Sequence, residues 1–158
     1  MKLIDILKQE YIKIPLFSTS KEEVVRELID ILTPFSIYEN HDLVYSAIMA
    51  REAIMTTGVG KGVAIPHCKK NECKEFAIAL GIHPQGVDYQ SIDGKPAQIF
   101  FLLIGPETNP GMHIRLLSRI SRLISKDMLR EKLLSCSSAS EAYHLIKTEE
   151  EKYFEIAS

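Results

Sequence analysis

Two amphipathic helices are predicted in the first third of the chain. The first follows Ser20, which has the capping-box spacing to Glu23, and Pro34 forbids its continuation. A second helix is expected to begin at about residues 40–42 and to end at about Met55, because Thr56-Thr57-Gly58 follows. The apolar residues of the first helix recur on one face: Val24, Val25, Leu28, Ile29 and Leu32.

Short apolar runs bounded by glycine, proline or charged residues predict buried strands in the middle of the chain. A further strand is expected at residues 12–16, where apolar positions alternate, and Pro15 restricts it to a sheet edge. The three central runs are residues 63–65, 77–82 and 99–104.

The pattern is helical again beyond Pro110. Residues 128–133 continue that helix or form a separate one, and Ser138 with Glu141 repeats the capping box before a final helix. The charged run at residues 149–152 is interpreted as a solvated, fraying tail. The predicted apolar stripe of the first of these helices contains Ile114, Leu117, Ile120 and Ile124.

The order of these elements predicts the fold class. Helices flank the strands at both ends of the chain, and short turns rather than crossover helices join the central strands. We therefore expect a mixed β-sheet between helical layers, in the α/β or α+β range. A length of 158 residues suits a single domain spanning residues 1–158.

Composition and charge narrow the function. The formal net charge of −2 arises from interspersed acids and bases, which disfavours nucleic-acid binding. No apolar run approaches the roughly 18–20 residues of a membrane span, so we expect a protein that is not membrane-inserted. Cys68, Cys73 and Cys136 are too few for a disulfide framework, which favours a reducing compartment, the cytoplasm.

The most informative segment is residues 58–67, where three alternating glycines precede an apolar strand that ends at His67. Bare backbone at Gly58, Gly60 and Gly62 permits close approach of a ligand. A P-loop would need Ser or Thr directly after its lysine, where this chain has Gly62, and the glycine spacing misses the dinucleotide fingerprint. Nucleotide binding is therefore disfavoured.

A histidine beside exposed amides suits phosphoryl transfer, because a neutral imidazole can attack phosphorus. Such a site mainly has to position the phosphoryl group and neutralise its charge. Arg51, just before the glycines, can make paired bonds to phosphoryl oxygens. His113 at the start of a later helix and the hydroxyl of Thr57 are further candidate donors.

These residues resemble a known family: the fructose/mannitol-type enzyme IIA domains of the bacterial phosphoenolpyruvate-dependent phosphotransferase system, including their nitrogen-regulatory branch. The likeness covers nearly the whole chain. The matching segments are Arg51-Glu52-Ala53, Thr57-Gly58-Val59-Gly60, Gly62-Val63-Ala64-Ile65-Pro66-His67, Gly86-Val87-Asp88-Tyr89, Asp93-Gly94-Lys95-Pro96, the strand at 99–104, and His113 with Leu116-Leu117.

The resemblance implies that His67 takes a phosphoryl group through its Nε2 atom from the phosphorylated carrier HPr, without metal, nucleotide or other cofactor, and that His113 and Arg51 assist. It further implies that a IIB domain or a regulatory target protein is the next partner. The sequence departs from the usual pattern at Thr56-Thr57 and Ala97-Gln98, and neither departure touches His67.

Three alternatives stay open at this stage. A freestanding domain equally suits sugar transport and the regulatory branch, where the phosphorylation state controls partner proteins. His67, Cys68 and Cys73 suggest a metal- or ligand-binding module, although their spacing matches no structural zinc pattern. A cysteine-histidine hydrolase lacks a recognisable motif around either thiol.

Overall fold

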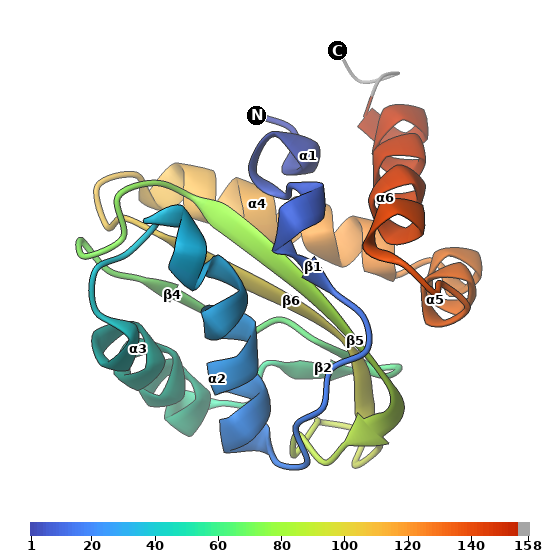
Figure 1. Cartoon of the computed structure of the whole chain (residues 1–158), viewed down its shortest axis with the longest axis horizontal. Coiled ribbons are helices and arrows are strands. Elements are labelled where there is room, and N and C mark those ends of the chain that lie inside the picture. Colours follow the sequence, from blue (N-terminus) through green and yellow to red (C-terminus); the bar gives the residue numbers. More distant parts are fainter. Residues whose placement is uncertain (155–158) are drawn as a thin grey trace.

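The computed structural model describes residues 1–154, which form a mixed sheet with helices on both of its faces (Figure 1). The strand order is β1-β5-β6-β3-β2, and β4 also pairs with β6. Strands β5 and β6 are antiparallel, whereas β1 runs parallel to β5, and β3 and β4 run parallel to β6. The strands are β1 (Ile12–Lys13), β2 (Gly58–Gly60), β3 (Val63–Ala64), β4 (His67–Lys69), β5 (Ala77–Val87) and β6 (Ala97–Gly105).

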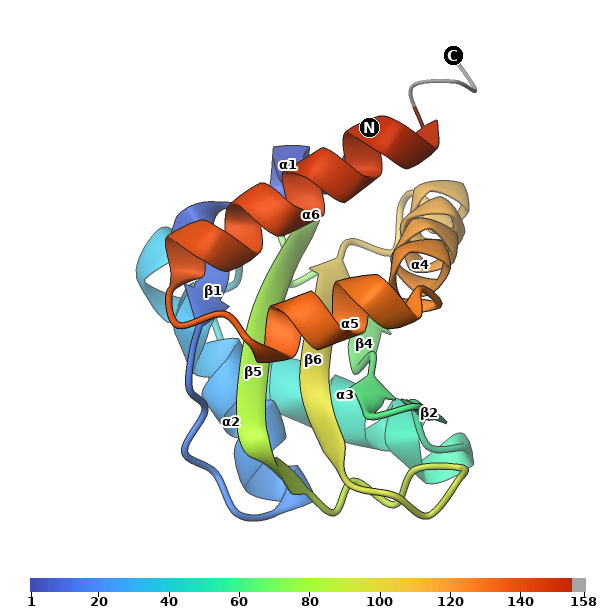
Figure 2. The same cartoon turned by 90° about the vertical axis from the view of Figure 1, so that its right-hand side faces the viewer.

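The helices form two layers. Helices α2 and α3 cover one face of the sheet, and α5 and α6 lie over the opposite face, as Figure 2 shows. This arrangement confirms the predicted fold class, a mixed sheet between helical layers. The helices are α1 (Leu3–Ile6), α2 (Lys21–Leu32), α3 (His41–Ile54), α4 (Pro110–Ile124), α5 (Asp127–Leu134) and α6 (Ala139–Phe154), with short 3₁₀ turns at Gln9–Tyr11 and Thr33–Phe35.

Capping residues explain where the helices begin. The side chain of Ser20 accepts a hydrogen bond from the backbone N–H of Glu23, which confirms the predicted start of α2. Asn40 accepts two backbone hydrogen bonds at the start of α3. Asn109 caps α4, and Pro110 occupies the first turn, where its missing N–H costs nothing.

The predicted face of α4 was wrong at Ile114, which is 65% exposed. The buried stripe instead contains His113, Leu116, Ile120, Leu123 and Ile124. The prediction followed apolar residues alone, and the real stripe begins with a histidine one position earlier. This shift turns His113 toward the interior of the protein and leaves Ile114 on the surface.

The charged C-terminal run was also predicted wrongly as a solvated tail. It lies in α6, and the carboxylate of Glu150 is buried. Glu150 accepts backbone hydrogen bonds from Leu3 at 2.5 Å and Ile4 at 3.2 Å, and it lies 3.6 Å from the guanidinium of Arg119. The carboxylate thus links α1 to α6, because it accepts hydrogen bonds from backbone N–H groups in the first turn of α1 that have no partner within the helix.

Strand β6 is the central strand of the sheet, because it pairs with β5, β3 and β4. Its residues from Ile99 to Gly105 are buried. The predicted strand at residues 12–16 is shortened to β1, which lies at the sheet edge as Pro15 required. Sequence patterns missed the short strands β2 and β4, since three residues are too few to establish an alternation.

Candidate functional site

His67 is positioned by strand pairing rather than by a free loop. It opens β4, where it is the partner of Leu103 in β6, and β3 pairs with the same strand at Ile99 and Phe100. Between β3 and β4 the backbone N–H of Leu103 donates to the carbonyl of Pro66 at 3.0 Å. The histidine backbone is therefore anchored on both sides to the most buried strand of the protein.

The hydrogen bond of the His67 ring decides which nitrogen is available for chemistry. Its Nδ1 lies 2.7 Å from the carbonyl oxygen of Ile65. A carbonyl oxygen only accepts hydrogen bonds, so Nδ1 carries the proton in the neutral ring. The lone pair of the imidazole is consequently on Nε2, and the half-buried ring is held in one tautomer and orientation.

His113 faces His67 from the first turn of α4. The two ring centroids are 5.6 Å apart, with the planes tilted by 51°. The His113 ring is buried, and neither of its nitrogens has a hydrogen-bond partner within residues 1–154. A buried imidazole without partners is energetically unfavourable, so both ring nitrogens of His113 have unused hydrogen-bonding capacity.

Arg51 reaches the same cavity from the last turn of α3. One guanidinium nitrogen donates to the carbonyl of Met55 at 2.8 Å, a contact that also suits a cation at a helix C-terminus. The cavity has a volume of about 430 Å³. Its polar lining consists of Arg51, His67, Lys69, Glu107 and His113.

The surroundings of both histidines favour the neutral ring. Burial is the main cause that lowers the pKa of His67, with further lowering by Arg51 and Lys69, while the Ile65 carbonyl and Glu52 oppose the shift. Burial also lowers the pKa of His113 to about 4, followed by the charges of His67 and Lys69. Both shifts favour the uncharged imidazole at neutral pH.

A buried ion pair supports the end of α3 beside the site. Glu52 lies 2.9 Å from the ammonium group of Lys21, and both side chains are buried. Glu52 also accepts hydrogen bonds from the backbone N–H and the hydroxyl of Thr57. Through these contacts Glu52 holds Thr57, the residue before the glycine segment, close to the end of α3.

The structure brings together His67, His113 and Arg51, but it places the predicted loop residues elsewhere. The hydroxyl of Thr57 faces Glu52, and the cavity lining contains neither Thr57 nor the glycines. Gly58 packs against Ser91, where a Cβ would lie 2.3 Å from the serine oxygen, and Gly60 lies near Asp93 with a positive φ of 94°. Gly62 has a positive φ of 78° and lies near Gln98. Phosphoryl contacts by these residues stay a prediction.

Sequence reasoning missed two features of the site. Glu107 lines the cavity from the loop after β6, and no motif marked it. Lys21 and Glu52 form a pair across 31 positions of the sequence. The only available signal was the position of Glu52 directly after Arg51 in the motif. Its burial depends on the packing of α2 against α3, which periodicity does not reveal.

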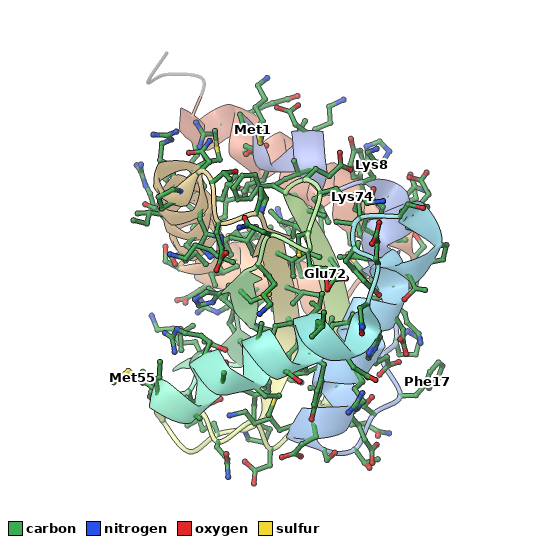
Figure 3. The ribbon with its side chains drawn as sticks, turned by 90° about the vertical axis from the view of Figure 1, so that its left-hand side faces the viewer. Met1, Lys8, Phe17, Met55, Glu72 and Lys74 are labelled. Atoms are coloured by element: carbon green, nitrogen blue, oxygen red, sulfur yellow. The ribbon has the colours of Figure 1, made fainter. Side chains whose placement is uncertain are left out.

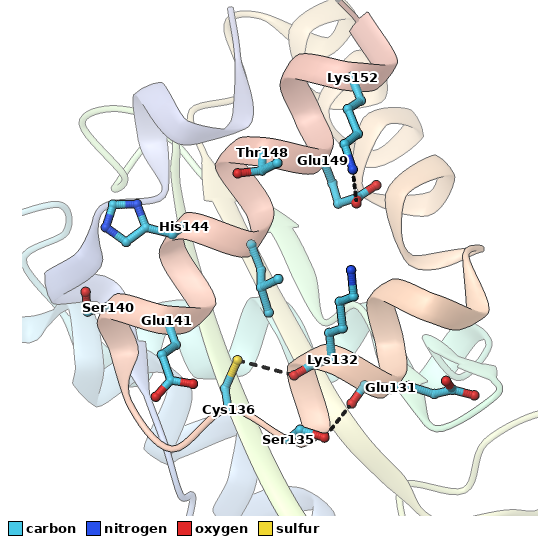
Figure 4. A pocket seen from close by; sticks show the side chains of 11 residues that line it. Glu131, Lys132, Ser135, Cys136, Ser140, Glu141, His144, Thr148, Glu149 and Lys152 are labelled. Carbon is cyan, nitrogen blue, oxygen red and sulfur yellow. Dashed lines mark hydrogen bonds and ion pairs between the residues drawn. The ribbon is translucent and has the colours of Figure 1, made fainter.

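A larger cavity, about 730 Å³, lies between α5 and α6, and its lining contains neither His67 nor His113 (Figure 4). It contains Cys136 and His144, and its other polar groups are lysine, glutamate and hydroxyl side chains. Within residues 1–154, no group of three or more histidine, cysteine or carboxylate side chains is arranged to hold a metal ion. The described residues also contain no helix with the length and apolarity needed to cross a membrane.

The fold is that of a IIA-type phosphotransferase domain. The chain belongs to the family described as phosphoenolpyruvate-dependent sugar phosphotransferase system, EIIA 2, which it matches over residues 5–149. The resemblance found in the sequence is thereby confirmed at the level of the family.

Relatives from both branches of the family are similar to this chain. The fructose-specific EIIABC component of Bacillus subtilis is 36% identical over 138 residues, which cover 87% of this chain but only 22% of that protein. The nitrogen regulatory protein of Bradyrhizobium diazoefficiens is 30% identical over 146 residues, covering 92% of this chain and 95% of that protein. The crystal structure of the nitrogen regulatory protein IIA-Ntr from Neisseria meningitidis superimposes with a TM-score of 0.83 at 31% identity, covering 90% of this chain and 97% of that one.

Proposed function

We propose that Nε2 of His67 accepts a phosphoryl group from an HPr-type phosphocarrier and passes it to a IIB domain in the cytoplasm. The hydrogen bond from Nδ1 of His67 to Ile65 is the observation that carries this proposal, because it leaves the Nε2 lone pair free. As a new P–N bond forms at Nε2, the bond between phosphorus and the donor breaks. No proton has to leave His67, since Nδ1 keeps its proton and continues to donate it in a hydrogen bond to the Ile65 carbonyl.

The charge of the phosphohistidine is balanced by groups that converge on the cavity. A phosphoryl group adds roughly −1.5 to −2 charge. Arg51 and Lys69 line the cavity as cations, and His113 supplies a buried N–H donor that no described residue occupies. Preorganised donors of this kind are suited to the loose transition state of phosphoryl transfer, where charge spreads over the phosphoryl oxygens.

Exposed apolar side chains around the cavity support protein partners. Ile54 and Ile114 line the cavity and are 81% and 65% exposed. Met55 is 65% exposed and projects from the end of α3, as Figure 3 shows. Apolar residues around a polar cavity are typical of a surface that a macromolecule covers, and a covered surface would exclude water during transfer.

The acceptor is tested with candidate IIB proteins. The phosphorylated chain, prepared with phosphoenolpyruvate, enzyme I and HPr, is mixed with each candidate, and loss of phosphate from the chain is followed. Transfer to a fructose-type IIB domain is expected, in line with the similarity to the Bacillus subtilis component. If phosphorylated HPr cannot phosphorylate this protein, the phosphocarrier proposal itself is contradicted.

The second candidate function is regulation of partner proteins by the phosphorylation state of His67. The similarity to the Bradyrhizobium diazoefficiens nitrogen regulatory protein, which is 30% identical over 146 residues, supports it. A regulator would accept phosphate from HPr and fail to pass it to any IIB protein. The same transfer experiment therefore separates the two functions.

A further inference from the structure

The side chain of Glu52 closes a short loop at the end of α3. The helix ends at Ile54, and the next residue, Met55, is already extended, with φ of −165° and ψ of 137°. The Glu52 carboxylate accepts a hydrogen bond from the backbone N–H of Thr57, at 3.1 Å from one oxygen and 3.2 Å from the other. The chain that leaves the helix is therefore tied back to the last turn of α3.

The carbonyl of Met55 lies inside this closed segment and binds Arg51. Its oxygen accepts a hydrogen bond from one guanidinium nitrogen of Arg51 at 2.8 Å. Because Met55 has left the helical conformation, the direction of its carbonyl depends on where the following residues are held. The bond between Thr57 and Glu52 holds the chain two residues further on. A guanidinium has five N–H donors, so this contact leaves others for a group in the cavity.

Glu52 is itself held from α2. The ammonium group of Lys21 lies 2.9 Å from Oε1 of Glu52 and 4.6 Å from the centre of the Tyr89 ring. The side chains of Lys21 and Glu52 are 9% and 2% exposed. Desolvation offsets much of the attraction within a buried ion pair, so such a pair is weak evidence for stability. The close contact does restrict where the Glu52 carboxylate can lie.

A matched arrangement occurs elsewhere in the fold. Glu27 in α2 lies 2.8 Å from the ammonium group of Lys13 and accepts hydrogen bonds from the backbone N–H groups of Phe17 and Ser18. None of these residues lines the cavity that contains His67. The chain thus has two carboxylates that each join a lysine to a loop, and only the loop held by Glu52 carries a contact to Arg51.

We propose that Glu52 is a positioning residue, which holds the loop whose Met55 carbonyl orients the Arg51 guanidinium toward the phosphoryl group. Glu52 does not line the cavity, so it acts through Arg51 rather than on the phosphoryl group itself. A misplacement of about 1 Å can cost on the order of 10²-fold in rate. The rate effect rests on the proposed function of His67, whereas the order of the Arg51 side chain does not.

The test compares two conservative variants of Glu52 in phosphorylation by HPr. Glu52→Gln loses the charge but keeps the length and one oxygen that accepts from Thr57, so its rate should stay within about threefold of native. Glu52→Asp keeps the charge but is one methylene shorter, so its rate should fall at least about tenfold. The matched control Glu27→Asp should retain the native rate. Urea unfolding establishes that each variant is folded.

A double-variant cycle asks whether the effect passes through Arg51. In Arg51→Ala the guanidinium is already absent, so adding Glu52→Asp should slow transfer less than about twofold further, whereas independent roles would multiply the two losses. A second readout uses unphosphorylated protein labelled with ¹⁵N in its arginine side chains. NMR relaxation should show the Nε–H group of Arg51 ordered in the native and Glu52→Gln proteins and mobile in Glu52→Asp.

Three results would overturn this inference. They are a folded Glu52→Asp protein with the native rate, a Glu52→Gln protein slowed tenfold or more, and losses that multiply in the cycle with Arg51→Ala. If Glu52→Asp does not fold, the rate of Glu52→Gln decides alone. If native protein is not phosphorylated at all, the proposed function fails, and an Arg51 side chain equally ordered in native and Glu52→Asp protein would still refute the positioning role.

Discussion

Nδ1 of His67 and the carbonyl oxygen of Ile65 are 2.7 Å apart, and this contact determines the chemistry of the site. It lies within a two-residue span, so the segment that carries the histidine also sets its tautomer. The free lone pair is on Nε2, while Arg51, Lys69 and His113 line the same cavity. Under the proposed function, these residues provide a nucleophile and donors for a transferred anion without any group that must be deprotonated first.

Replacement of Arg51 tests the proposed clamp on the phosphoryl group. Arg51→Ala should slow phosphorylation by HPr about 10²-fold, since removal of one preorganised donor typically costs this much. Arg51→Lys should recover only part of the rate, because an ammonium group lacks the bidentate geometry of guanidinium. Stopped-flow or quenched phosphorylation measures these rates. The control Arg26→Lys alters an exposed arginine on α2, and equal rates for native and Arg51→Ala protein would remove Arg51 from the mechanism.

Replacement of His113 should separate stability from function. His113→Leu removes two buried nitrogens without partners in the described residues, so the free energy of unfolding should rise by about 1–2 kcal/mol. Phosphoryl transfer should fall about 10²-fold because a donor is lost. Urea unfolding and transfer rates measure the two effects.

The matched control for that experiment is His83→Leu. His83 is also buried, but its Nε2 lies 2.8 Å from the carbonyl of Ser18. The substitution should therefore lower the free energy of unfolding and leave transfer unchanged. A His113→Leu protein that is less stable than the native chain would contradict the idea that the His113 ring is held ready for a ligand.

The pKa of His113 predicts how stability depends on pH. Burial lowers this pKa from 6.5 to about 4, so the unfolded chain binds the proton more readily in that window. The contribution of the neutral His113 ring to the free energy of unfolding is therefore fully present above about pH 6.5 and is lost as the pH falls toward 4. The lowered pKa of His67 changes stability in the same direction.

Between about pH 7.5 and pH 5 the expected loss from His113 is about 2 kcal/mol. Urea unfolding at the two pH values measures this loss, and the His113→Leu variant serves as the reference with a shallower dependence. Identical pH slopes in the two proteins would show that the ring of His113 titrates normally.

Thr57 allows the phosphoryl-binding and supporting roles to be distinguished. Its hydroxyl donates to the buried carboxylate of Glu52, so Thr57→Val should lower the free energy of unfolding by about 1–3 kcal/mol. The transfer rate of the folded variant should stay close to that of the native chain. Thr57→Ser retains the hydroxyl and should restore stability. A large loss of rate in folded Thr57→Val would instead support the phosphoryl contact that the sequence suggested.

The sequence predicted the fold where the signal was local. Ser20 and the apolar face of α2 predicted that helix correctly, because capping and periodicity act within a few residues. The predicted stripe of α4 was right at Ile120 and Ile124 but wrong at Ile114, since the buried face begins with His113, and a histidine does not count as apolar in a periodicity argument. Glu150 illustrates the same limit, because its burial depends on Leu3 at the other end of the chain.

The candidate site was predictable in its residues but not in its geometry. The motif around His67 and the position of Arg51 before it pointed to phosphoryl transfer, and the structure places both at one cavity with His113. The family resemblance implied Nε2 of His67 as the accepting atom, but the residue pattern alone did not predict the tautomer, because it depends on a bend that turns the ring back onto Ile65. The supporting role of Thr57 depends equally on the tertiary burial of Glu52.

The most direct test identifies which histidine nitrogen carries phosphorus. The chain is labelled with ¹⁵N in its histidine rings, phosphorylated through HPr, and studied by NMR under basic conditions that preserve phosphohistidine. We expect phosphorus coupled to Nε2 of His67, a proton retained on Nδ1, and no adduct in His67→Gln. Phosphorus on Nδ1 of His67, or on any other histidine, would contradict the account.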